Sequence, residues 1–249
     1  MRRYPSTYAS SFSFGPGPLS TALKALIAAN VAMFLVTALG RFNLNPILGL
    51  VPRSVVTKFW IWQLATYMFL HGGLFHILFN MLALWMFGTE LERVWGTRYF
   101  LKFYFVTGIG AAALTVLVSL LPFAATAPIY VVPTVGASGA IYGLLLAYAM
   151  YFPDRPIYMY FVFPVPARIF VIIMGALAFY ASVSGSDGGV ASWTHLGGLL
   201  IAYLFLKNAR LRPFSEVKYR YLKWKINRVR KKFDVYSGGR ADDWDRRVH

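Results

Sequence analysis

Two apolar segments of the chain carry side chains that could together perform acyl transfer. Residues 136–139 are Gly-Ala-Ser-Gly and open an apolar stretch that ends at Phe152, and His195 begins another such stretch. A serine hydroxyl becomes a nucleophile when an imidazole within hydrogen-bond reach takes its proton. Ionisable residues inside a membrane are costly and mark function. Ser138 and His195 are therefore the candidate nucleophile and general base.

The groups that acyl transfer needs besides a nucleophile and a base are also present. His76 and Asn80 are four residues apart, as are Ser138 and Tyr142, so each pair lies on one helix face. Negative charge that develops on a carbonyl oxygen needs hydrogen-bond donors. The backbone amide of Ser138 at a helix start and the side chains of His76 and Asn80 are candidate donors. No carboxylate is available to orient His195, and Tyr142 can stack on its ring instead.

Small residues recur at the interval that allows two membrane helices to approach closely. Gly139 is followed by Gly143, and Gly198 is followed by Ala202, each four residues later. A crossing of the two helices at these positions would bring the candidate serine and histidine within reach of each other.

The composition predicts a protein that lives in lipid. Of 249 residues, 58% are hydrophobic and 14% are charged, and the mean hydropathy is +0.54. Aromatic residues make up 18% and suit the membrane interfaces. The chain has no cysteine, which excludes disulfides, thiolate catalysis and thiolate metal sites.

Six segments are apolar and long enough to be membrane helices when neighbours shield them. They are Leu23–Leu39, Leu74–Gly88, Tyr99–Leu121, Ala137–Phe152, Ala167–Ala181 and Trp193–Leu206. The fold class expected is an all-α polytopic membrane protein. Arg41–Leu70 is a long loop of mixed polarity that we expect to lie on the membrane surface. Prolines at 156, 164 and 166 favour extended or interfacial backbone over Ile157–Val165.

The basic residues predict the orientation. The net charge is +16, and Lys207–His249 holds fourteen Lys and Arg against five acidic residues. The positive-inside rule places this tail, and with it both termini, in the cytoplasm. Within the tail, the apolar positions Leu222, Ile226, Val229 and Phe233 predict a basic amphipathic helix on an anionic leaflet, or else a solvated tail. We divide the chain into a basic N-terminus (1–22), a helical domain (23–206) and this tail (207–249).

The predicted orientation brings the candidate residues together. The second, fourth and sixth segments then run in the same direction, so residues near their starts share one leaflet. Ser138, His195, His76 and Asn80 all lie near such starts. The orientation depends only on the basic residues, so the common depth of these four residues is an independent indication of one site.

At this point the residues show a likeness to a family. From Leu23 to Leu206 the chain resembles the rhomboid intramembrane serine proteases, with a six-helix core of the prokaryotic type. The likeness rests on three motifs, which are His71-Gly-Gly-Leu-Phe-His76 with Asn80, Gly136-Ala-Ser138-Gly139 with Tyr142 and Gly143, and His195 with Gly198. Glu92 followed by Gly96 also resembles the family's cytoplasmic turn.

The resemblance implies a function and a set of roles. It implies Ser138 as nucleophile, His195 as general base, and His76, Asn80 and the Ser138 amide as oxyanion hole. It also implies cleavage of other proteins' transmembrane segments near the outer face of the membrane, without metal or cofactor. The setting expected is the plasma membrane of a bacterium or archaeon, with transmembrane proteins and the bilayer as partners and no nucleic acid. Many members have Trp-Arg where this chain has Trp62-Gln63, so the first loop is anchored differently here.

Other interpretations of the same residues remain open. A serine such as Ser138 is by itself more often a helix-packing residue than a nucleophile. Together with His195, it is better explained as a nucleophile. His71 is expected to order the start of the second helix, with Gly136 among the supporting residues. The sequence contains no His-Glu-x-x-His motif, which argues against a metal site of the zinc-protease type. A small transporter and a rhomboid-like protein that binds helices without cutting them are the competing functions.

Overall fold

The computed structural model describes residues 17–40, 43–122, 126–159, 163–184 and 190–210. The predicted amphipathic helix of the tail lies outside the described residues, as do residues 1–16. The division into three domains therefore stays a prediction.

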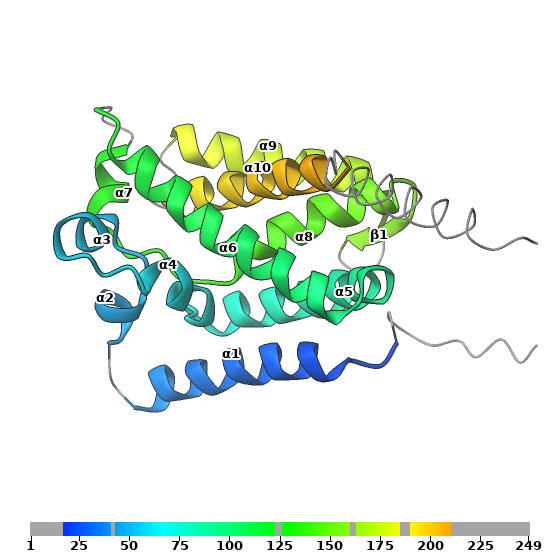
Figure 1. Cartoon of the computed structure of the whole chain (residues 1–249), viewed down its shortest axis with the longest axis horizontal. Coiled ribbons are helices and arrows are strands. Elements are labelled where there is room, and N and C mark those ends of the chain that lie inside the picture. Colours follow the sequence, from blue (N-terminus) through cyan, green and yellow to red (C-terminus); the bar gives the residue numbers. More distant parts are fainter. Residues whose placement is uncertain (1–16, 41–42, 123–125, 160–162, 185–189, 211–249) are drawn as a thin grey trace, which may run out of the picture. The chain divides into compact units, whose positions relative to one another are not determined.

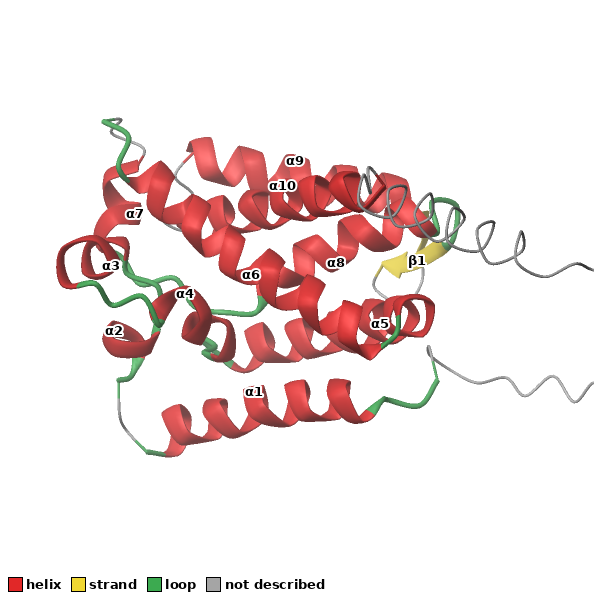
Figure 2. Cartoon of the chain, in the orientation of Figure 1, coloured by secondary structure: helices red, strands yellow, loops and turns green. Residues whose placement is uncertain are grey.

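Six longer helices form the described part of the chain (Figure 1, Figure 2). They are α1 (Thr21–Leu39), α5 (Leu74–Trp95), α6 (Thr97–Ser119), α8 (Ser138–Tyr151), α9 (Ala167–Ser184) and α10 (Val190–Arg210). Each overlaps one of the six predicted segments. The largest difference is in α5, which continues through Gly88 because that glycine packs against Leu23 and Phe100. The helix ends only at Gly96, whose φ of +75° is readily adopted by glycine.

Short elements occupy the connections. The loop after α1 contains α2 (Asn45–Leu48), α3 (Pro52–Lys58), α4 (Gln63–Thr66) and the 3₁₀ turn η1 (Tyr67–Phe69), and α7 (Ala127–Val131) precedes α8. Proline at the first or second position starts α2 and α3, where its missing N–H costs nothing. The strands β1 (Pro156–Met159) and β2 (Phe163–Pro166) form an antiparallel pair with Ile157 opposite Val165. This hairpin is the extended segment that the prolines predict.

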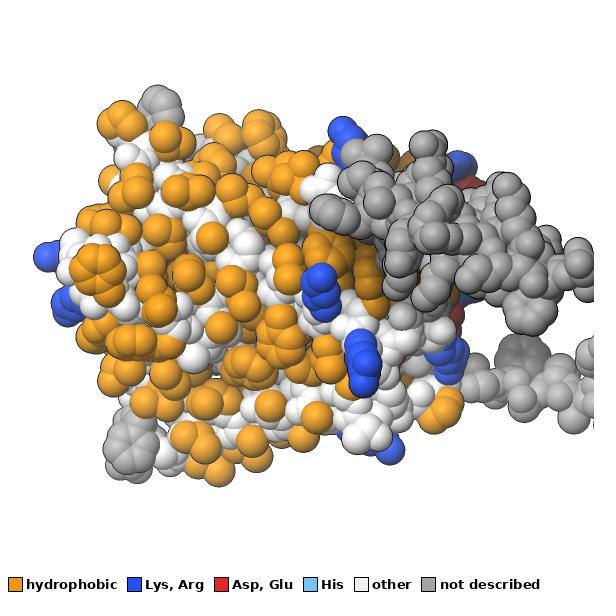
Figure 3. Space-filling model, viewed as in Figure 1, with side chains coloured by type: hydrophobic (Ala, Val, Ile, Leu, Met, Phe, Trp, Pro, Cys, Tyr) orange, Lys and Arg blue, Asp and Glu red, His pale blue; other side chains and the backbone are white. Residues whose placement is uncertain are grey.

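The helices pack with an apolar interior and an apolar exterior. The helix α1 packs on α5, both α5 and α6 pack on α8, and α8 packs on α9. Phe100, Tyr104 and Leu144 are fully buried in the interior. On the outside, hydrophobic side chains cover the face shown in Figure 3, and Leu39 is 77% exposed. Lipid is the solvent in which such a surface is stable.

Four of the described helices are long and apolar enough to cross a membrane. These are α1, α5, α6 and α9, whereas α8 is apolar but has only 14 residues. A helix of 14 residues spans about 21 Å, which is less than the hydrocarbon core of about 30 Å. The four long apolar helices make the protein an integral membrane protein of mostly helical fold.

A buried carboxylate joins three helix ends. Glu92 is 6% exposed and accepts hydrogen bonds from the hydroxyls of Ser20 and Thr97, each at 2.6 Å. Ser20 also caps α1 by accepting from the amide of Leu23. Glu92 lies in the last turn of α5, just before the turn at Gly96. Glu92 holds the start of α1, the end of α5 and the start of α6 together.

Glu90 makes a second link at the same end of the bundle. Its carboxylate pairs with Arg93 at 3.0 Å and with Arg155, in the turn after α8, at 2.9 Å. Because these side chains are partly exposed, each pair stabilises the fold only slightly. The pairs nevertheless show that the end of α5 and the end of α8 lie together, opposite the Ser138 end of α8.

The first loop is anchored by Gln63. Its side chain is fully buried and accepts from the amide of Val51 at 3.0 Å. Its amide nitrogen donates to the carbonyl oxygens of Pro46, at 3.0 Å, and Ile47, at 3.2 Å. A neutral amide therefore connects α2, the start of α3 and α4 without burying a charge.

We expect Gln63→Leu to loosen this loop. It removes the Gln63 partner of the Val51 N–H and of the Pro46 carbonyl, at about 1–3 kcal/mol for each group that stays buried. The Ile47 carbonyl keeps its hydrogen bond from the Trp62 indole. Thermal unfolding in detergent should show a lower midpoint. The control is Thr57→Val, since the Thr57 hydroxyl is exposed and bonds only to Arg53 in its own helix. Equal midpoints for the two variants would contradict the anchoring role.

Candidate active site

The turn that leads into α8 is fixed to the first loop. Leu50 and Thr134 exchange two backbone hydrogen bonds of 2.9 Å, and the amide of Gly136 donates to the carbonyl oxygen of Tyr67 at 2.9 Å. Gly136 has a φ of +123°, which favours glycine. A Cβ at this position would lie 2.7 Å from Nε2 of His76. Glycine is therefore required both by the backbone and by the neighbouring ring.

Ser138 is the first residue of α8 and contacts His195 on α10. Its hydroxyl oxygen and the Nε2 atom of His195 are 2.8 Å apart, although 57 residues separate them in the chain. The ring of Tyr142 stacks on His195 with centroids 4.2 Å apart and an angle of 3° between the planes. Tyr142 is one turn beyond Ser138, so a single face of α8 holds both contacts with the imidazole.

Small residues allow α8 and α10 to meet at this depth. A Cβ on Gly198 would collide with the carbonyl oxygen of Gly139, and one on Gly143 would lie 3.3 Å from Cβ of Ala202. The two pairs of small residues found in the sequence thus face each other. The helix backbones touch directly at Gly139 and Gly198.

A pair of threonines that the sequence argument overlooked also fixes α10. Thr115 of α6 and Thr194 of α10 are buried, and their hydroxyl oxygens are 2.8 Å apart. Thr115 also donates to the carbonyl oxygen of Ala111. Thr194 precedes His195, so the bond sets the rotation of α10 next to the site. The sequence could have indicated this contact, since Thr115 and Thr194 are hydroxyl residues within two predicted membrane helices.

Tyr67 is a second residue that the sequence argument overlooked. Its side chain is fully buried, and its hydroxyl donates to the carbonyl oxygen of Gly108 on α6 at 2.7 Å. Burial, with Tyr104 nearby, raises the pKa of this hydroxyl, so it remains a neutral donor. The same residue holds Gly136 through its backbone carbonyl. Tyr67 therefore connects α6, the first loop and the turn before Ser138.

His76 presents a ring N–H to the site. Its Nδ1 accepts a hydrogen bond from the amide of Gly72 at 3.3 Å. In a neutral imidazole the proton then sits on Nε2. A Cβ built on Gly136 would lie 2.7 Å from this Nε2 and 3.6 Å from the hydroxyl oxygen of Ser138. The N–H of His76 and the Ser138 hydroxyl therefore border the same small space.

Asn80 lies one turn after His76 and is 7% exposed. Its amide nitrogen donates to the carbonyl oxygen of His76 at 2.7 Å, which uses one of two N–H groups. The second N–H is available to a bound carbonyl oxygen.

His71 lies beside the site rather than in it. Its ring packs edge-on against His76, with centroids 5.1 Å apart, and among the described residues neither ring nitrogen has a hydrogen-bond partner. Burial, followed by the charge of His76, lowers the pKa of His71 to about 4. His71 is therefore neutral at neutral pH and packs against the ring that faces Ser138.

The arrangement suits nucleophilic attack by a hydroxyl. Ser138 has an imidazole nitrogen within hydrogen-bond distance, and its backbone amide lies in the first turn of α8, where no helical carbonyl is available to accept. The amide and His76 provide donors beside the hydroxyl. The helix dipole adds positive potential at the same point.

We expect Gly198→Ala to disrupt this site. The added methyl group must push α10 away from the Gly139 carbonyl, which separates His195 from Ser138 and costs about 1–3 kcal/mol. Labelling of Ser138 by a fluorophosphonate and thermal unfolding in detergent should both decrease. Gly73→Ala is the matched control, since a Cβ there meets no atom within 4 Å and the φ of 175° is extended backbone. Normal labelling of the Gly198 variant would show that the close crossing is not needed.

Comparison with known proteins places these features in a family. The family model described as the Rhomboid domain matches residues 58–208, which is more than half of the chain. Rhomboid protein 1, mitochondrial, of Saccharomyces cerevisiae is 33% identical over 138 residues, covering 55% of this chain and 38% of the relative. Rhomboid protease GluP of Bacillus subtilis is 32% identical over 180 residues, covering 70% and 32%. Rhomboid protease AarA of Providencia stuartii is 31% identical over 153 residues, covering 57% and 54%.

The matched part corresponds to about a third to a half of each of these relatives. The Rhomboid-domain match begins in the first loop and ends in the last turn of α10, so it contains Ser138, His195, His76 and Asn80. The domain match and the membrane helices lead to one conclusion: the chain belongs to the rhomboid family.

Proposed function

We propose that the protein is an intramembrane serine endopeptidase that uses Ser138 and His195 as a catalytic dyad. The observation that carries this proposal is the 2.8 Å contact between the Ser138 hydroxyl and Nε2 of His195, formed between two helices of a membrane protein. Two relatives that carry the name rhomboid protease support it. Binding of helices alone, or transport, gives no reason for a serine hydroxyl to face an imidazole that is held by a stacked tyrosine.

The proposed reaction proceeds through an acyl-enzyme. The Ser138 oxygen attacks the scissile carbonyl carbon, while Nε2 of His195 takes the hydroxyl proton. The Ser138 amide, His76 and Asn80 donate hydrogen bonds to the resulting oxyanion. The imidazolium then gives its proton to the leaving amine as the C–N bond breaks. Water deprotonated by His195 hydrolyses the ester and restores the Ser138 hydroxyl.

Tyr142 takes the orienting role that a carboxylate plays in a catalytic triad. Its ring is parallel to the imidazole, which limits rotation of His195 about its side-chain bonds. The dyad therefore has a fixed geometry without a buried negative charge. A carboxylate at this depth would itself need a partner to be stable in lipid.

The substrates we propose are transmembrane segments of other proteins, cleaved near one face of the bilayer. The α1, α5, α6, α8, α9 and α10 helices would form a six-helix core in which α8 is shielded by its neighbours. Ser138 lies at the start of α8, and Glu90, Arg93 and Arg155 lie at its far end. Since basic residues favour the cytoplasm, the Ser138 end would face away from it, with both termini inside.

We expect Ser138→Ala and His195→Ala each to abolish cleavage of a single-span reporter by the purified protein in liposomes. The first removes the nucleophile and the second removes the base. A fluorophosphonate should label wild type at Ser138 and neither variant. Cleavage that survives either substitution would refute the dyad. Intact wild-type protein that neither labels nor cleaves would instead favour a protein that binds or transports.

We expect Asn80→Ala to reduce kcat about 10²–10³-fold with little change in KM, as loss of one oxyanion donor does. The matched control is Asn30→Ala on α1. Asn30 is also buried, and its amide nitrogen donates to the carbonyl oxygen one turn back, that of Leu26, at 2.8 Å. The two variants lose the same type of side chain and the same helix contact. An equal decrease in kcat for both would assign Asn80 to folding rather than to the oxyanion.

A further inference from the structure

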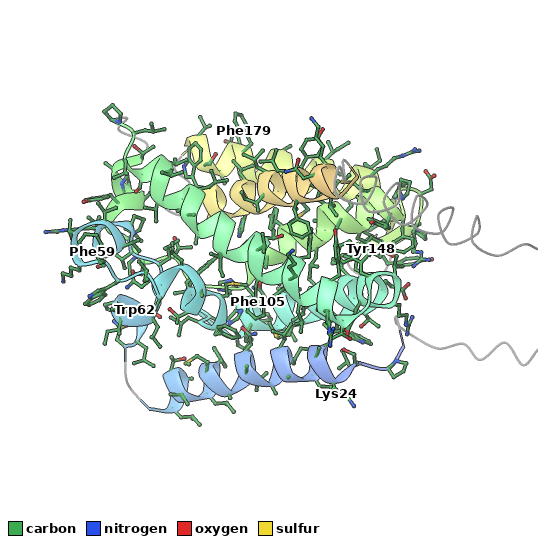
Figure 4. All side chains as sticks on the ribbon, in the orientation of Figure 1. Lys24, Phe59, Trp62, Phe105, Tyr148 and Phe179 are labelled. Atoms are coloured by element: carbon green, nitrogen blue, oxygen red, sulfur yellow. The ribbon has the colours of Figure 1, made fainter. Side chains whose placement is uncertain are left out.

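An exposed apolar and aromatic surface lies at the junction of α3 and α4. We call it the loop-1 patch and define it as Arg53, Lys58, Phe59, Ile61 and Trp62, with Trp60 behind them. Phe59 is 78% exposed, Ile61 is 65% exposed and Trp62 is 43% exposed. Figure 4 shows Phe59 and Trp62 at this end of the molecule. No described element covers these three side chains.

The backbone at Phe59 is constrained to present this side chain. Phe59 has φ of 56° and ψ of 34°, and it is the one non-glycine residue with positive φ in the described part of the chain. A bulky residue in this left-handed region is strained. The amide of Trp60 donates to the carbonyl oxygen of Ser54 and that of Ile61 to the carbonyl oxygen of Phe59, which holds the turn in place. This left-handed residue is the C-cap of α3, and the turn leaves the Phe59 side chain 78% exposed.

The rings next to Phe59 form a rigid support for a cation. Trp60 and Trp62 stack with centroids 5.4 Å apart, and Nζ of Lys58 lies 4.9 Å from the centroid of Trp60. The indole N–H of Trp62 donates to the carbonyl oxygen of Ile47 at 3.0 Å. Because both rings are held in place, the cation–π contact fixes the position of the Lys58 ammonium group over Trp60.

Within the described ranges, no carboxylate lies at the same end of the bundle as the cations of the patch. Arg53 and Lys58 are exposed, and the acidic residues within the described ranges are Glu90, Glu92 and Asp154. Glu90 and Glu92 lie in the last turns of α5, and Asp154 lies in the turn after α8, which is the opposite end. On the face shown in Figure 3, basic side chains appear at both ends and acidic ones only at the end away from α3.

The patch lies where the helices leave the hydrocarbon core. The helix α1 ends at Leu39 just before the first loop, and α5 begins at Leu74 just after it. Aromatic rings and basic side chains are stable at this level of a bilayer, where the rings reach the acyl chains and the cations reach phosphate. An apolar patch alone could also bind a soluble partner. The two neighbouring cations, Arg53 and Lys58, and the position of the patch at the membrane interface favour lipid.

We propose that the loop-1 patch binds anionic phospholipid in the leaflet next to Ser138. Arg53 and Lys58 contact the anionic headgroup, and Phe59 and Ile61 enter the acyl-chain boundary. The patch is linked to the candidate active site through Gln63 and Tyr67, since the carbonyl of Tyr67 holds Gly136. Lipid bound there restrains the loop on which the turn before Ser138 depends. This binding does not rest on the proposed protease activity.

The test uses quenching of tryptophan fluorescence in phosphatidylcholine vesicles. One set contains brominated phosphatidylglycerol, and the other contains the same fraction of brominated phosphatidylcholine. Wild type should show excess quenching by the anionic lipid. The double variant R53Q/K58Q should reduce this excess, because each cation near an anionic surface is worth about a fivefold change in binding. The basic residues 207–249 are the same in both proteins, so the difference between the two reports the loop-1 patch. Since both leaflets have the same composition, the orientation of insertion does not affect the result.

The matched control is R98Q/K102Q, which removes two exposed cations at the opposite end of the bundle and should retain most of the excess. Phe59→Gly keeps the left-handed backbone without strain and should reduce quenching by both lipids. Equal quenching of wild type by the two lipids would overturn the proposal, as would an excess in R53Q/K58Q as large as that of wild type. Crosslinking of Phe59 to a second copy of the chain would also overturn it. No substrate is needed, so the result is independent of cleavage.

Discussion

The direct contact of α8 with α10 is the constraint on which the rest of the site depends. Ser138 and His195 are 2.8 Å apart because the backbone of Gly198 lies against the carbonyl oxygen of Gly139. In lipid no hydrophobic force drives two helices together, so close packing and hydrogen bonds must do so. Glycine at this crossing provides the packing, and the serine–imidazole contact is one of the hydrogen bonds. The geometry of the candidate site and the helix interface are therefore the same feature.

Three further hydrogen bonds connect α6 and the first loop to the crossing of α8 and α10. The Thr115–Thr194 bond fixes α10 on α6, the Tyr67 hydroxyl fixes the first loop on α6, and the Tyr67 carbonyl fixes Gly136. All three use neutral groups and are buried, so each retains most of its strength in the absence of water. The loop between α1 and α5 is consequently part of the site and not a peripheral connection. Its anchoring by Gln63 avoids a buried guanidinium charge.

The sequence predicted the parts of the fold that depend on local pattern. Six apolar segments, the prolines before α9 and the spacing of small residues located the helices, the hairpin and the crossing. The long-range contacts that hold the fold and the site could not be predicted, since Glu92 with Ser20, Thr115 with Thr194 and Tyr67 with Gly108 each join residues far apart in the chain. The end of α5 was placed too early because the apolar segment ends at Gly88, before Thr89 and Glu90, whereas the helix continues to Trp95. The roles of Ser138, His195, His76 and Asn80 stay predictions.

The two ends of the bundle are stabilised by different chemistry, and this difference bears on function. At the end with Glu90, Glu92 and Asp154, carboxylates pair with arginines or accept from hydroxyls, and the ion pairs are exposed to water. At the Ser138 end, the described contacts that hold the loops are neutral hydrogen bonds and aromatic stacking. A fixed charge beside Ser138 would bias the protonation of His195 and attract water into the helix interface. Neutral bracing is consistent with the proposed proton transfer by His195 and with the proposed contact of the loop-1 cations with lipid headgroups.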